Sequence, residues 1–373
     1  MKKIILLFLF IYPLFCDAQK TIENFIEIKD SSLLSVIKKS LNLGELDSIT
    51  KKNALTLKEI KSYENVNDLS GIENFTNLEQ LELSNYRGKI STIKPLKNLL
   101  QLQTLKLTVN SELDLSPLKK LKKLEYLNLK YVKSTNYSYL SNLENLKELT
   151  LHCKGFQNTE PLKKLSRLKY FSFYQKDTTP VLLVLPDSIL TLSINFIRTS
   201  NLKGLSNLKH LENLSIQNCH FLDFTSFPNF PKLHDLIIRK SNFNKVSTLT
   251  HLESLSMLSL SDCTIKDYSN LQRIDKLNEL YILNGNLQSI SQLVNLNLIY
   301  LNISNADISD IQNLKSIPTL ESIHLEKVIV KSLNFANTLQ QLKRLQLNGT
   351  SLSKSQIEDF KTLHPNIWVY YME

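Results

Sequence analysis

The chain has 373 residues, of which 42% are hydrophobic and 21% are charged, and this composition is typical of a folded protein rather than a disordered one. Only 7 residues are glycine, which argues against glycine-rich phosphate loops and long flexible linkers. The net charge of +10 comes from lysines scattered along the chain, without the basic–aromatic motif of a nucleic-acid-binding fold, so we interpret it as a solvated basic surface.

The first 18 residues have the layout of a secretory signal peptide. Residues 1–3 are positively charged, residues 4–15 are almost purely apolar, and the small residue Ala18 follows. An apolar run of about a dozen residues is too short to cross a bilayer of ~30 Å. Cys16 follows Phe15 rather than the small residue that a lipobox requires. We therefore predict cleavage after Ala18, with lipid anchoring at Cys16 as the less favoured alternative. We also predict no transmembrane segment after signal removal, and an extracellular, periplasmic or cell-surface location.

Residues 19–58 are predicted to form an N-terminal helical cap. The segment 30–41 has apolar residues near helical spacing, with Asp30, Ser31 or Ser32 as the residue that caps its start. Thr50 is predicted to cap a second short helix that runs through Leu55. A cap of this kind shields the end of a core that would otherwise be open to solvent.

The pattern L-x-x-L-x-L recurs through most of the chain. Thirteen copies begin, in order, at Leu78, Leu102, Leu124, Leu146, Leu168, Ile189, Leu211, Leu233, Leu255, Leu277, Leu298, Leu320 and Leu342. The first and last starts are 264 residues and twelve intervals apart, so the mean period is 22 residues. A degenerate copy precedes them at Leu57, Ile60 and Ser62.

Each repeat carries more apolar side chains than it can bury alone, so neighbouring repeats must stack into one continuous core. A coil of 22 residues has room for a short strand but not for a full helix on its outer side, which favours a 3₁₀ turn or an irregular segment there. We therefore predict an α/β repeat solenoid over residues 59–353: a leucine-rich-repeat horseshoe or arc with a parallel β-sheet on its concave face.

Residues 68–78 read DLSGIENFTNL and resemble the repeat entry segment of the internalin-type, 22-residue leucine-rich-repeat proteins of bacteria. The resemblance extends from about Asp30 to the C-terminus, and it implies a concave sheet that binds another protein. The family often places an asparagine near the ninth position of each repeat, where its side chain bonds backbone along the ladder. Here that position is mixed and holds Asn110, Val132, Cys219, Ser241, Cys263, Val328 and Thr350. We therefore expect less regular coils.

Residues 354–373 are predicted to form the C-terminal cap. The segment Lys354–Leu363 has a helical pattern, and residues 366–371 supply a last strand. The aromatic side chains of Trp368, Tyr370 and Tyr371 are expected to cover the open end of the core.

Three cysteines remain after removal of the signal peptide: Cys153, Cys219 and Cys263. Cys219 and Cys263 occupy the same repeat position two coils apart, which places their Cα atoms ~9–10 Å from each other. A disulfide requires less than ~7 Å. We therefore predict buried thiols and no internal disulfide.

The sequence lacks the spacing of known catalytic and metal sites. It contains no HExxH, no CxxC and no GxSxG motif. His152, His234 and His324 fall at predicted concave positions, but four strands separate each from the next, too far for one metal ion, and we interpret them as solvent-facing. We therefore predict no enzymatic activity, no catalytic or metal-binding residues, and no cofactor.

Strand alternation places the residues between the repeat leucines on the concave face. Two candidate partner-binding patches follow: the first comprises Ile237, Met257, Tyr281 and Tyr300, and the second comprises Tyr126, Tyr170 and Tyr174. Exposed aromatic and methionine side chains are enriched at interface hot spots, although tyrosine also suits an ordinary sheet surface.

Binding of a protein partner through the concave sheet is the favoured function. A glycan- or lipopolysaccharide-binding surface is an alternative, because tyrosines stack on sugars and lysines attract phosphate groups. A structural spacer of the cell envelope is a further alternative. Nucleic-acid binding is disfavoured because the chain is predicted to be exported and its lysines do not gather in one groove.

Overall fold

The computed structural model describes residues 25–372 except residues 85–88, 135, 177–178, 200 and 222–225. The predicted signal peptide, with Cys16, lies outside these described residues. The chain forms two compact units, Met1–Gly155 and Phe156–Glu373. Among the helices of the described ranges, none combines the length and the apolar character that crossing a bilayer demands.

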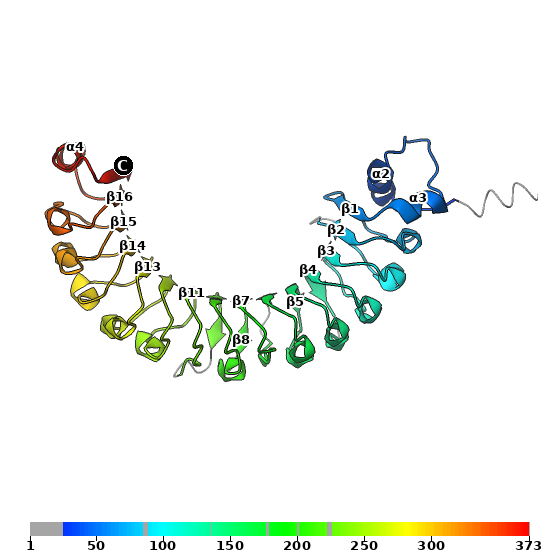
Figure 1. The fold of residues 1–373 in the computed structure, drawn as a ribbon, viewed down its shortest axis with the longest axis horizontal. Helices are drawn as coiled ribbons and strands as arrows, with labels where there is room; N and C mark the ends of the chain where they lie inside the picture. Colours follow the sequence, from blue (N-terminus) through cyan, green and yellow to red (C-terminus); the bar gives the residue numbers. More distant parts are fainter. Residues whose placement is uncertain are drawn as a thin grey trace, which may run out of the picture. The chain divides into compact units, whose positions relative to one another are not determined.

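The described part of the first unit contains two short α-helices and five parallel strands. The helices are α2 (Ser31–Ser40) and α3 (Lys51–Thr56). The strands pair in chain order and are β1 (Glu59–Ser62), β2 (Gln80–Leu83), β3 (Thr104–Thr108), β4 (Tyr126–Lys133) and β5 (Glu148–Lys154). Within this unit the strands line the inner side of a curve and the 3₁₀ turns lie on its outer side (Figure 1).

Asp30 begins the N-terminal helix and ties it to the first repeat. Its side chain accepts a hydrogen bond from the Leu33 N–H at 2.9 Å, which caps α2. The same carboxylate accepts from the Asn67 N–H at 2.8 Å. α2 packs against β1 and buries Leu33 and Ile37 completely. Thr50 caps α3 through a reciprocal capping box, so both predicted helices are confirmed.

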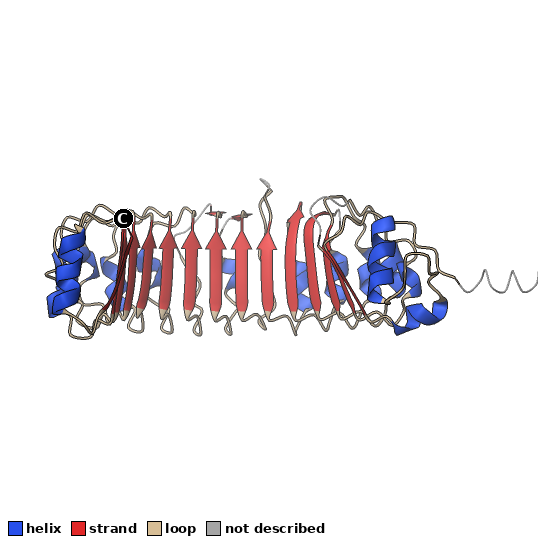
Figure 2. Ribbon diagram, turned by 90° about the horizontal axis from the view of Figure 1, so that it is seen from above, coloured by secondary structure: helices blue, strands red, loops and turns tan. Residues whose placement is uncertain are grey.

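The second unit continues the same architecture over more repeats. Its main strands are β6 (Tyr170–Tyr174), β7 (Thr191–Asn195), β9 (Asn213–Gln217), β11 (Asp235–Arg239), β12 (Met257–Ser261), β13 (Glu279–Leu283), β14 (Tyr300–Ser304), β15 (Ser322–Glu326), β16 (Arg344–Asn348) and β17 (Trp368–Met372). All pair in parallel with their neighbours in this order. Figure 2 shows them side by side and pointing the same way. Two short strands, β8 (Arg198–Thr199) and β10 (His220–Phe221), form a separate pair.

Short 3₁₀ helices return the chain from one strand to the next. They are η1 (Ile72–Asn74), η2 (Lys94–Asn98), η3 (Ser116–Lys120), η4 (Ser138–Asn142), η5 (Glu160–Lys164), η6 (Lys203–Leu205), η7 (Val246–Leu249), η8 (Ser269–Arg273), η9 (Ile290–Leu293), η10 (Ile311–Ser316) and η11 (Ala336–Thr338). Most of them bury one leucine, such as Leu118 in η3 and Leu271 in η8. The predicted combination of a strand with a 3₁₀ turn or an irregular segment is confirmed, because the described residues between β6 and β7 and between β9 and β11 form no 3₁₀ helix.

The core of each unit is the stack of leucine and isoleucine side chains between strands and turns. On β12, for example, Leu258 is fully buried and Leu260 is 1% exposed, while the alternate residues Met257 and Ser259 are partly exposed. This alternation repeats on the neighbouring strands because successive side chains point to opposite faces of a sheet. Each strand therefore presents one face to the core and one to solvent, as the repeat pattern predicts.

The C-terminal cap differs from its prediction in one respect. α4 (Lys354–Leu363) and β17 form as expected, but only Tyr371 packs against α4, where its ring lies 4.7 Å from Lys361 Nζ. Trp368 and Tyr370 are 54% and 40% exposed and stack on each other with ring centroids 5.9 Å apart. They lie at alternate positions to Tyr371, so strand geometry turns them to the inner face rather than over the end of the core.

Candidate functional site

The first predicted patch lies on the inner face of the second unit. Its members come from four neighbouring strands: Ile237 from β11, Met257 from β12, Tyr281 from β13 and Tyr300 from β14. All four side chains are partly exposed. In the sheet register, Met257 and Tyr300 lie in one row with Glu279 between them, while Ile237 and Tyr281 lie in the next row. The four side chains therefore share one surface.

Tyr281 and Tyr300 form a pair at one side of this surface. Their ring centroids are 4.9 Å apart and their planes are inclined by 35°. The Tyr281 hydroxyl donates a hydrogen bond to Glu279 Oε2 at 3.2 Å, and Asn302 Nδ2 donates to the Tyr300 hydroxyl at 3.4 Å. Ring contact and hydrogen bonds hold both side chains in place, so little side-chain entropy remains to be lost when a partner docks.

Both hydroxyl groups of the pair are protonated at neutral pH. Burial, assisted by the charge of Glu279 and by Tyr300, raises the pKa of Tyr281 to about 12. Burial also raises the pKa of Tyr300. The pair therefore offers a partner two uncharged phenols, each with an apolar ring and a polar tip.

Two further apolar residues, neither of them part of the prediction, border the first patch. Leu283 ends β13 on the same face as Tyr281 and is partly exposed. Strand alternation could have identified Leu283, because it lies two residues after Tyr281 and residues two apart on a strand share a face. Ile299, immediately before β14, is 44% exposed. No alternation signal marks Ile299, because it precedes the strand.

The second predicted patch is divided between the two units. In the first unit, Tyr126 begins β4 and is 37% exposed. In the second unit, Tyr170 and Tyr174 stand at opposite ends of β6, and the Tyr174 ring lies 5.1 Å from that of Phe196. Four residues along a strand separate two side chains by ~13 Å, so Tyr170 and Tyr174 do not form a pair like that of the first patch.

A shallow depression of about 340 Å³ surrounds Tyr126 on the inner face of the first unit. Its lining consists of Glu82, Thr104, Lys106, Tyr126, Leu127, Asn128, Glu148 and Thr150. Glu82 Oε2 and Lys106 Nζ are 3.2 Å apart. Asn128 Oδ1 is buried and accepts no hydrogen bond from the described residues. The depression thus combines one aromatic ring with several hydrogen-bonding groups.

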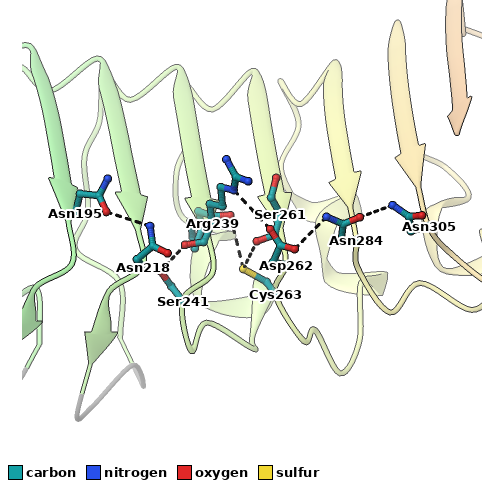
Figure 3. Close-up of polar contacts among 10 residues, drawn as sticks. Asn195, Asn218, Arg239, Ser241, Ser261, Asp262, Cys263, Asn284 and Asn305 are labelled. Carbon is teal, nitrogen blue, oxygen red and sulfur yellow. Dashed lines mark hydrogen bonds and ion pairs between the residues drawn. The ribbon is translucent and has the colours of Figure 1, made fainter. Parts of the chain in front are cut away.

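A polar row borders the sheet of the second unit where its strands end. Figure 3 shows its members, which are Asn195, Asn218, Asp262, Asn284 and Asn305. Asn218 Nδ2 donates to Asn195 Oδ1 at 3.1 Å, Asn284 Nδ2 donates to Asp262 Oδ1 at 3.0 Å, and Asn305 donates to Asn284. Arg239 Nε lies 3.5 Å from Asp262 Oδ2. These contacts join successive coils.

The ninth repeat position, one residue further along, is mixed as predicted. Ser241 Oγ accepts from the Cys219 N–H at 3.1 Å and donates to the Arg239 carbonyl at 2.9 Å. Cys263 donates its thiol to the Ser261 carbonyl at 3.3 Å. The asparagines of the ladder therefore lie mainly one position earlier than the family pattern suggests.

Solved structures with the same arrangement come from several sources. An internalin (inlF) from Listeria monocytogenes matches with a TM-score of 0.66 and 22% identity, over 92% of this chain and 95% of that one. A leucine-rich-repeat protein from Leptospira interrogans matches with a TM-score of 0.59 and 19% identity, over 86% and 97%. The plant peptide hormone receptor RGFR1, solved in complex with RGF2, matches with a TM-score of 0.54 and 17% identity, over 87% and 56%.

The chain has an internalin-like leucine-rich-repeat fold. No protein-family model and no curated protein sequence matches it. At 22% identity or less, the solved structures establish the fold of the chain and not its ligand.

Within this internalin-like fold, the reactive side chains are dispersed. Cys153, Cys219 and Cys263 are buried and take part in no disulfide among the described residues. Burial raises the pKa of Cys219 to about 12, which keeps its thiol protonated and unreactive. Of the three histidines predicted to face solvent, His234 is exposed and His152 and His324 are partly exposed. No group of three or more potential metal ligands occurs among the described residues.

Proposed function

We propose that this protein is a secreted or surface-associated leucine-rich-repeat protein that binds another protein through the inner face of its second unit. The observation that carries the proposal is the Tyr281–Tyr300 pair, which lies on one surface with Met257 and Ile237. Tyrosine and methionine at the centre of a rigid sheet are typical of protein-binding hot spots. The signal-peptide pattern of residues 1–18 supports export.

The internalin-like fold supports a binding role rather than a catalytic one. Its strands present a long row of side chains on an open face, which suits recognition of an extended partner. The plant receptor that shares the fold was solved with its partner RGF2 bound. An open sheet is poorly suited to exclude water from a reaction, and this also favours binding.

Affinity capture tests the proposal. Residues 19–373 are immobilised and exposed to cell-envelope and extracellular extracts, beside a Tyr281→Ala/Tyr300→Ala variant and a Tyr139→Ala control. Tyr139 is a partly exposed residue of η4, on the outer side of the first unit. The proposal expects a protein that the parent and the control retain and that the double variant loses. Circular dichroism checks that all three chains are folded.

The other outcomes separate the competing functions. Equal retention by the parent and the double variant would contradict the first patch and move the site to Tyr126, or to Tyr170 and Tyr174. If no protein is retained by any chain, a protein partner is contradicted, and a structural spacer or a glycan ligand is favoured.

The depression around Tyr126 favours a glycan as the second candidate ligand. One aromatic ring beside hydroxyl, carboxylate and amide groups is the chemistry that a sugar ring requires, since sugars present apolar faces and hydroxyl edges. The lining also includes Asn128, whose buried Oδ1 has no partner among the described residues. Saturation-transfer NMR with free monosaccharides tests this alternative. It predicts a signal that Tyr126→Ala abolishes and Tyr281→Ala/Tyr300→Ala preserves; absence of any signal from the parent chain contradicts it.

A further inference from the structure

Two carboxylates lie on one side of the Tyr281–Tyr300 pair. Glu279 lies beside Tyr300 in the sheet register, and Asp235 lies two strands further along the same row. Neither carboxylate makes an ion pair with any described residue. Both are only partly exposed, so part of their hydration is already lost.

An unpartnered acceptor lies next to the same pair. Asn302 is the register neighbour of Tyr281, and its Nδ2 donates to the Tyr300 hydroxyl. Its Oδ1 is buried and accepts no hydrogen bond from the described residues. Buried polar atoms are normally satisfied, so this oxygen becomes an acceptor for a donor from outside once the Asn302 side chain turns toward the surface.

The basic side chains near this surface are held elsewhere or lie at a distance. Arg239 lies 3.5 Å from Asp262 at the other end of the strands. Lys343 Nζ is 2.7 Å from Glu321. Arg344 shares the row of Glu279 but lies two strands beyond Tyr300. The surface around the two tyrosine rings therefore presents acceptors and negative charge.

We propose that Glu279, Asn302 and the two rings form a subsite for a cationic side chain of the protein partner, arginine by preference, and that Asp235, two strands from Glu279, adds to the negative potential of this subsite. The inference rests on the proposed function and specifies its partner. Arginine carries five donors and no acceptor, which complements this set of acceptors. Its planar cation also stacks on aromatic faces, which attract positive charge. A partner side chain with an uncharged hydrogen-bond donor would bond Asn302 Oδ1 equally well, but it would leave both carboxylates without a positive charge beside them.

Synthetic peptides with one variable residue between leucines test the subsite. Arginine, citrulline and glutamate are compared at that position, since citrulline keeps the shape of arginine and removes its charge. The parent chain is expected to bind the arginine peptide at least about tenfold more tightly than the citrulline peptide. In an Asp235→Asn/Glu279→Gln variant this ratio should fall to about twofold or less. A Glu253→Gln control, exposed and outside the patch, should keep the parent ratio.

The results distinguish this inference from the proposed function. Equal binding of arginine and citrulline peptides by the parent overturns the subsite, as does an unchanged ratio in the carboxylate variant or no peptide binding at all. The proposed function stands in each case if Tyr281→Ala/Tyr300→Ala still loses its captured protein. Higher salt should weaken the arginine peptide more than the citrulline peptide, because only the former binds through charge.

Discussion

At the scale of single residues, a left-handed backbone conformation follows most strands of the second unit. Asn218, Asp262, Asn284 and Asn305 have φ values of 51°, 52°, 51° and 51°. Asparagine and aspartate tolerate this conformation better than other non-glycine residues because their short polar side chains bond locally. Lys240 occupies the equivalent position with a φ of 45° and interrupts the polar row between Asn218 and Asp262.

Replacing Lys240 should therefore stabilise the protein. Lys240→Asn relieves part of the ~1–2 kcal/mol cost of a left-handed residue and adds a donor toward Asn218 Oδ1. We expect the free energy of unfolding to rise by about 1–2 kcal/mol, measured by urea unfolding. Lys209→Asn is the matched control, since Lys209 is exposed and has negative φ. A loss of stability in Lys240→Asn would contradict this, because it would mean that the contacts of the lysine stabilise the fold by more than the asparagine gains.

His324 should make stability depend on pH. Its Nε2 lies 3.2 Å from Asn348 Nδ2, its strand neighbours Asn302 and Gln346 are neutral, and burial lowers its pKa from 6.5 despite the nearby charge of Glu326. The unfolded chain then binds the proton more readily than the folded chain. The contribution of neutral His324 to the free energy of unfolding is therefore complete above pH ~6.5, and it is lost as the pH falls through the pKa of the folded state. His324→Gln should reduce the acid-side loss measured by urea unfolding; an unchanged pH profile would contradict this.

At the scale of elements, close packing of one coil on the next restricts the outer turns. Gly204 in η6 has no space for a side chain, because a Cβ atom there would lie 2.0 Å from the Leu183 carbonyl oxygen of the preceding coil. Gly204→Ala should lower the free energy of unfolding by about 1–3 kcal/mol, because η6 must move away from its neighbour. Thermal unfolding measures the change. Lys203→Ala in the same turn is the control and should have little effect, and equal stability of both variants would argue against tight coil packing.

Most of the elements follow from sequence periodicity alone. Each described strand from β2 to β16, apart from the short β8 and β10, begins two residues after a repeat start, as Leu255 and Met257 illustrate. The cap helices also followed from local signals, because Asp30 and Thr50 are good N-caps. The repeat pattern does not predict the β8–β10 pair, because it predicts one strand in each repeat and both of these short strands lie outside those positions.

The candidate site was only partly predictable from the sequence. Alternation correctly placed Tyr281 and Tyr300 on the inner face of adjacent strands. It does not report that the rings meet at 4.9 Å or that Asn302 Oδ1 lacks a partner, because both depend on side-chain rotamers. Trp368 was expected to cover the end of the core, but its place in β17 turns it to the inner face, because successive side chains of a strand point to opposite sides.

At the scale of the whole molecule, stacking of repeats separates stability from recognition. Core leucines hold neighbouring coils together, whereas the inner-face residues are free to vary without loss of the core. Function in such a protein depends on which side chains share the inner face. In the second unit these are the two tyrosines with their apolar and acidic neighbours.

The most direct test of this account is the dissociation constant of the captured protein for three chains. For Tyr281→Ala/Tyr300→Ala the account predicts binding at least about 30-fold weaker than for the parent, the loss that a single hot-spot residue of ~2 kcal/mol produces. For Tyr139→Ala it predicts a change within about twofold, as for an energetically neutral surface residue. Equal affinities for the parent and the double variant, with both chains folded, would contradict the central claim that the inner face of the second unit binds the partner.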